Sequence, residues 1–101
     1  MNEAARDIDG FVGKKSFEDY IRDKQLRMAV ERAFEIIGEA LSQLHKCDAS
    51  TAERITNWQA IVAFRNVLIH GYAQVNPERT WDVVQTELPT LRRELSQLID
   101  Q

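Results

Sequence analysis

The chain has 101 residues and a formal net charge of −3, from 13 basic and 16 acidic side chains. Its composition, 44% hydrophobic and 29% charged with four glycines and two prolines, excludes collagen-like, low-complexity and disordered chains. The charge balance argues against a sequence-independent nucleic-acid binder, which gains its affinity by neutralising phosphates, unless basic residues gather locally, for instance through a second copy.

The length predicts a single domain, residues 1–101. Its first half is predicted to form three helices. Residues 4–12 are expected to form a short helix that ends near Gly13. Ser16 is a suitable N-cap for a helix over residues 17–22, with Asp19 three positions on as in a capping box. A long helix is expected from Asp23 to His45, because its apolar residues form one stripe at the 3.6-residue period: Leu26, Val30, Ala33, Phe34, Ile37, Leu41 and Leu44.

The opposite side of this long helix carries a charged row at four-residue spacing: Arg27, Glu31, Glu35 and Glu39. The first two can pair, whereas neighbouring glutamates repel one another by about 0.2–0.5 kcal/mol. Two interpretations remain open. The row is either a solvated face, or it needs a cationic partner from another chain or from the helix that carries Arg65.

The second half of the chain begins with a predicted loop, residues 46–56, that contains at most one short turn. Asn57 is expected to cap a helix over residues 58–70, and Gly71 is the left-handed residue expected just past its end. Residues in the middle of this segment favour strand, but its length and its two end signals indicate helix.

The last helix is predicted to begin at the triplet Asn-Pro-Glu, residues 76–78, which provides a cap, a proline in the first turn and an acidic residue. It is expected to reach about Asp100, with Pro89 breaking or kinking it near Leu88. The predicted fold is therefore an all-α, up-and-down bundle of four to five helices.

Cys47 is the only cysteine, so neither an internal disulfide nor a cysteine metal site is expected. The sequence gives no sign of a bound metal or cofactor. No run approaches the roughly 18 apolar residues of a membrane span, and the first residues do not resemble a signal peptide. We therefore expect a cytoplasmic protein that does not enter a membrane.

Four polar side chains interrupt the apolar segment FRNVLIHGY, residues 64–72: Arg65, Asn66, His70 and Tyr72. On a helix the first three fall within an arc of about 140°, and Tyr72 follows the helix end, from where it can fold back. Arginine offers a planar fork for phosphate oxygens, and histidine is the usual general acid or base near neutral pH. Together they could promote attack of a ribose 2′-hydroxyl on the neighbouring phosphate without a metal or a protein nucleophile.

One chain supplies only one such histidine, whereas this reaction benefits from both a base and an acid. A two-fold homodimer would bring two sets into one cleft and would also concentrate two copies of Arg65 there. A structural interpretation stays open beside this one. His70 can interact with the dipole at a helix C-terminus, and Arg65 can extend its head from a buried helix into water.

The pattern R-N-x-x-x-H-x-Y resembles the signature of the HEPN superfamily, in particular its HepT-like toxins: an arginine, four residues, a histidine, one residue and a tyrosine. Arg65, His70 and Tyr72 match it without a gap. Residues 34–41, 57–72 and 81–95 resemble the family's second long helix, its motif helix and its last helix. The family usually has a longer first helix, so a shorter variant or a misplaced start codon is expected here.

The resemblance implies a metal-independent ribonuclease toxin that dimerises through its motif helices and has active sites between the subunits. It also implies that Arg65 and His70 are catalytic and that Asn66 supports them. A cognate nucleotidyltransferase antitoxin would transfer AMP from ATP to Tyr72, where the added phosphates would block RNA and neutralise Arg65. The alternatives are a non-catalytic HEPN domain that binds a nucleotide or a partner protein, and a purely structural bundle.

Overall fold

The computed structural model describes residues 1–71 and 75–99, and within them it contains helices and no strand. The helices are α1 (Asn2–Val12), α2 (Phe17–Arg22), α3 (Lys24–Cys47), α4 (Ala49–Ala52), α5 (Trp58–His70), α6 (Pro77–Thr86) and α7 (Leu88–Ile99). The predicted all-α bundle is confirmed. The described part has more helices than expected because the 46–56 loop contains the short α4 and the last predicted helix is divided in two.

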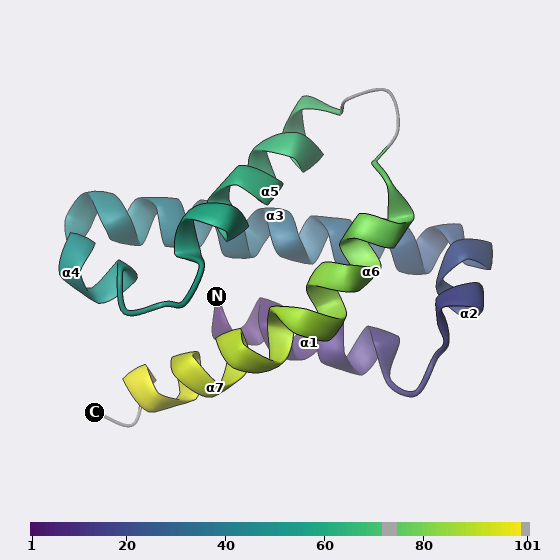
Figure 1. Ribbon diagram of the computed structural model, residues 1–101, viewed down its shortest axis with the longest axis horizontal. Helices are drawn as coiled ribbons and strands as arrows, with labels where there is room; N and C mark the ends of the chain where they lie inside the picture. The colour runs from purple at the N-terminus through teal and green to yellow at the C-terminus, as the bar shows by residue number, and fades with distance from the viewer. Residues whose placement is uncertain (72–74, 100–101) are drawn as a thin grey trace.

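The long helix α3 is the central element of the bundle (Figure 1). It packs against α1, α2, α4 and α5, while α7 packs against α1 and α6. The predicted apolar stripe of α3 lies in the core, where Leu44 is partly buried and the other six residues are buried. None of the described helices is long and apolar enough to cross a bilayer.

Local capping signals fix several helix starts, as the sequence predicts. The Ser16 hydroxyl accepts a hydrogen bond from the Asp19 N–H at 3.2 Å, and the Asp19 carboxylate accepts one from the Ser16 N–H at 3.0 Å. Asp23 caps α3 rather than belonging to it, since its carboxylate accepts a hydrogen bond from the Leu26 N–H at 3.0 Å. The Asn76 side chain caps α6 by accepting from the N–H of residue 78 at 2.9 Å.

The prediction for Asn57 was right in position and wrong in mechanism. Asn57 precedes α5, but its side chain makes no capping hydrogen bond, and its backbone is left-handed with φ 58° and ψ 29°. Asparagine tolerates this conformation better than most residues. Its side-chain amide instead donates to the two carboxylate oxygens of Glu87 at 3.1 and 3.2 Å. The start of α5 is therefore fastened to the junction between α6 and α7.

Glu87 marks the break in the last predicted helix. Pro89 lacks an N–H and its ring would clash with a carbonyl of the preceding turn, so a helix that reaches this point is broken or kinked. The chain accordingly leaves α6 at Thr86 and starts α7 at Leu88. The predicted break near Leu88 is confirmed.

Candidate functional site

Helix α5 carries three of the four predicted site residues. Its buried face holds Ile61, Phe64 and Leu68 in the core, and α5 packs along α3. Asn66 and His70 point away from that face and are exposed, while Arg65 lies at the edge nearest α3 with its side chain 26% exposed. The fourth residue, Tyr72, lies outside the described residues.

Gly38 of α3 allows the two helices to meet closely beside Arg65. A Cβ atom on this buried glycine would overlap the Cβ of Arg65 and would lie 2.7 Å from its Cγ. The backbone oxygen of Ile61 would be 3.5 Å away. The aliphatic part of Arg65 thus occupies the space that a side chain at position 38 would need.

The head of Arg65 is bound on two sides. Its Nη1 donates a hydrogen bond to the Asn66 side-chain oxygen at 2.8 Å, and its Nη2 forms an ion pair with the Glu39 carboxylate. For Glu39, this contact supports the interpretation that the acidic row of α3 needs a cationic partner. The partner is Arg65 of α5. Another member of the row, Glu35, has a partner on its own helix, Arg32, at 3.1 Å.

Glu39 is a weak base in this arrangement. Its carboxylate accepts a hydrogen bond from the Gln43 side-chain amide at 3.2 Å. This bond, together with the charge of Arg65, lowers the pKa of Glu39 below its ordinary value. A carboxylate that holds its proton less tightly than usual is poorly matched to proton abstraction near neutral pH.

His70 is the last residue of α5, directly before Gly71, which has the predicted left-handed conformation with φ 59° and ψ 35°. It is exposed at the end of the helix, about 7.5 Å along the helix axis from Arg65. An imidazole at this place lies in the favourable field of the helix C-terminus and can also reach a molecule that approaches from solvent.

The surface beside Arg65 is hollowed and partly apolar. A cavity of about 510 Å³ lies between α3 and α5, and its lining residues are Arg32, Glu35, Ile36, Glu39, Ala40, Arg65 and Ile69. Two of its apolar side chains are unusually open, with Ile36 42% and Ile69 48% exposed. The candidate site is thus bordered by apolar surface that the single chain leaves in contact with water.

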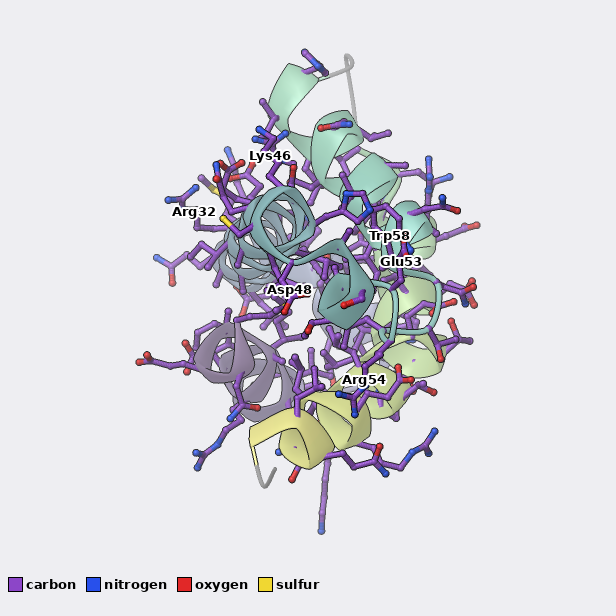
Figure 2. All side chains as sticks on the ribbon, turned by 90° about the vertical axis from the view of Figure 1, so that its left-hand side faces the viewer. Arg32, Lys46, Asp48, Glu53, Arg54 and Trp58 are labelled. Carbon is purple, nitrogen blue, oxygen red and sulfur yellow. The ribbon has the colours of Figure 1, made fainter. Side chains whose placement is uncertain are left out.

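The chain's other histidine, His45, belongs to α3 and lies beside the first residue of α5, at the end opposite to His70. His45 stacks on Trp58 with ring centroids 4.2 Å apart, and its Nε2 is 3.4 Å from the Glu53 carboxylate. Figure 2 labels Trp58 and Glu53 at this end of the molecule. Because Trp58 begins α5 and His70 ends it, the two histidines are separated by about 18 Å of helix. His45 therefore has a packing role, and it is too far from His70 for the two to act on one phosphate within one chain.

Residues 1–71 and 75–99 contain no group of three or more His, Cys, Asp or Glu side chains that could hold a metal ion. Cys47 is exposed and has no second thiol beside it, since the chain has only one cysteine. The expectation of a reaction without a metal stays a prediction, which the addition of a chelator can test directly.

Gly38 and Glu39 were not predicted as site residues. A sequence signal for Gly38 does exist, because a glycine inside a long helix costs about 1 kcal/mol relative to alanine. Such a residue on the apolar side indicates a close approach by another backbone or side chain. No comparable signal singled out Glu39 from the other glutamates of its row.

The chain matches a known protein family over almost its whole length. A family model described as ribonuclease HepT-like matches residues 1–98. A protein of Methanocaldococcus jannaschii named as a candidate RNase is 31% identical over 97 residues, which are 96% of this chain and 79% of that protein. A protein of Thermococcus cleftensis named as a candidate ribonuclease HepT is 33% identical over 96 residues, which are 95% of this chain and 86% of that protein. No solved structure gives a significant match.

Proposed function

The chain belongs to the HepT-like ribonuclease family, and on that premise we propose that it is a metal-independent endoribonuclease toxin. Arg65 would stabilise the charge that grows on the phosphate oxygens, and His70 would move a proton during attack by the ribose 2′-hydroxyl. Asn66 would support Arg65 through the hydrogen bond at 2.8 Å. The observation that carries this proposal is the placement of a held arginine and an exposed histidine on one side of α5.

The proposed site is completed by a second copy of the chain. The reaction needs one group to remove a proton and another to supply one. Within the described residues, His45 is too distant from His70, and the pKa of Glu39 is lowered. Exposed Ile36 and Ile69 beside Arg65 offer apolar area that a second α3–α5 face could cover. A two-fold homodimer would then bring two His70 side chains to one cleft.

The direct test is RNA cleavage by the purified protein in the presence of EDTA. We expect products with 2′,3′-cyclic phosphate ends, because the attacking oxygen belongs to the ribose beside the broken bond. Mass spectrometry of a cleaved oligonucleotide identifies these ends. An absence of cleavage that persists when Mg²⁺ or Mn²⁺ is added would favour a HEPN domain that binds a nucleotide or a partner without catalysis.

The proposal includes control by a nucleotidyltransferase antitoxin acting on Tyr72. The chain has two tyrosines, and Tyr20 is fully buried against Trp81, with ring centroids 5.3 Å apart. Burial, assisted by the Glu31 carboxylate, raises the pKa of Tyr20 to about 12. A buried and neutral phenol is a poor acceptor of AMP, so the modification is assigned to Tyr72, two positions after His70 in the sequence.

Incubation with ATP and the cognate nucleotidyltransferase is expected to add one or more AMP units to the wild-type chain. Tyr72→Phe should acquire none, whereas Tyr20→Phe should be modified as the wild type is. Intact-mass measurement followed by peptide mapping locates the adduct. We expect the modified protein to lose at least about tenfold in cleavage rate, because the added phosphates compete with RNA for Arg65. An adduct on Tyr20 would contradict the assignment.

A further inference from the structure

Two adjacent residues of α3 hold Arg65 in place. Gly38 leaves room for the aliphatic part of its side chain, and Glu39 binds its head. Glu39 is itself held one turn further along α3 by the Gln43 amide, at 3.2 Å. A continuous chain of polar contacts therefore runs from Gln43 through Glu39 and Arg65 to Asn66.

The orientation of the guanidinium depends on its two terminal nitrogens. Its third nitrogen, Nε, is buried and has no hydrogen-bond acceptor among the described residues. The Nη1 contact is with Asn66, the next residue of the same helix, and moves with α5. The Nη2 contact with Glu39 joins the head of Arg65 to a different element. Loss of Glu39 would leave the guanidinium held at one terminal nitrogen only.

Glu39 has two opposed effects on a phosphate that approaches Arg65. The guanidinium has five N–H donors, so its contacts with Glu39 and Asn66 leave the second N–H of each terminal nitrogen for phosphate oxygens. The Glu39 carboxylate, however, also places a negative charge beside that phosphate, because the Glu39 side chain is 48% exposed to the same solvent. The orientation favours the reaction, whereas the charge weakens RNA binding.

We infer that Glu39 is a positioning residue for Arg65, which it holds in the orientation that binds the reacting phosphate while it lowers the affinity for RNA. This inference rests on the proposed ribonuclease function. It predicts a change in kcat that is separate from the change in KM, because the orientation of Arg65 matters most in the transition state, whereas the charge of Glu39 repels the bound RNA and the transition state alike.

The kinetic test compares Glu39→Ala with Glu39→Gln on an oligonucleotide that has one cleavage site. Glu39→Ala is expected to lower kcat between about 10- and 100-fold, because a misplaced group loses about this much. Its KM should fall as well, since the repelling charge is gone. Glu39→Gln keeps an oxygen that accepts from Arg65, so it should keep kcat within about threefold while KM falls. The fall in KM should shrink as salt is added.

Asp9→Ala is the matched control. Asp9 forms another exposed ion pair between helices, with Arg92 of α7 at 2.6 Å. Its removal deletes one carboxylate and one inter-helix contact without touching Arg65, so kcat and KM should match the wild type. Circular dichroism and thermal unfolding of every variant separate a loss of fold from a loss of positioning.

A second measurement does not require cleavage. The side-chain ¹⁵N NMR signals of Arg65 should show restricted rotation of the guanidinium in the wild type and faster rotation in Glu39→Ala, where only the contact with Asn66 remains. If the wild type does not cut RNA, the proposed function fails, and this spectrum still decides whether Glu39 holds Arg65. Unchanged Arg65 signals, or an unchanged or raised kcat in Glu39→Ala, would overturn the inference. A Glu39→Gln variant as inactive as His70→Ala would assign proton transfer to Glu39 instead.

Discussion

A His70→Ala chain is expected to lose RNA cleavage by at least about a hundredfold, because general acid–base groups contribute about 10²- to 10⁴-fold. Its helical content should be retained, since His70 is exposed at the end of α5 and is not part of the core. Initial rates on a fluorescent oligonucleotide in EDTA measure the loss. Circular dichroism checks that the fold remains, and analytical ultracentrifugation checks the proposed dimer.

The other histidine provides the matched control. His45→Ala removes an imidazole of the same kind but breaks the stack with Trp58 at the far end of α5. We expect this variant to be less stable and to cut RNA at the wild-type rate per folded molecule. Equal losses of cleavage in the two variants would show that a histidine is needed for the fold rather than for proton transfer at Arg65.

Mixtures of the two chains test whether the site contains both copies of His70. If both are required, a randomised one-to-one mixture of wild type and His70→Ala should have about one quarter of the wild-type rate, because only that share of dimers carries two wild-type chains. If each chain acts alone, the mixture should retain about one half. The second result would contradict the shared cleft while leaving the ribonuclease function intact.

The sequence was sufficient for features that depend on neighbouring residues. The Ser16–Asp19 capping box, the Asn76 cap and the break at Glu87, just before Pro89, are all set by residues within one turn. The helical arc that joins Arg65, Asn66 and His70 also follows from the helix period, once α5 is recognised. The length of α5 and the signals at its two ends indicate helix, and they outweigh the strand preference of its middle residues.

Contacts between distant residues could not be predicted in the same way. Asn57 is a good capping residue by local preference, yet its side chain binds Glu87, which is 30 residues away. The acidic row left two interpretations open because the choice depends on how closely α5 approaches α3. That distance is set at Gly38, and it brings Arg65 to Glu39 rather than to the other glutamates.

Gly38→Ala is expected to lower the free energy of unfolding by about 1–3 kcal/mol, the usual range for forcing extra volume into a packed site. The new Cβ would overlap the Cβ of Arg65 and would lie 2.7 Å from its Cγ, so α3 and α5 must move apart. Helix propensity alone would give the opposite sign, because alanine is favoured over glycine by about 1 kcal/mol inside a helix. Urea denaturation followed by circular dichroism therefore tests the close approach through the sign of the change.

Gly10→Ala makes the same substitution inside α1, where a new Cβ would meet nothing within 4 Å. We expect it to raise stability by up to about 1 kcal/mol and to leave RNA cleavage unchanged.

Gly38→Ala should also lose cleavage, because separating the helices removes Arg65 from Glu39. In an Arg65→Gly background the overlapping atoms are gone, so the destabilisation caused by Gly38→Ala should become smaller than in the wild type. An equal destabilisation in both backgrounds would mean that Gly38 is not the residue that sets the distance between Arg65 and α3.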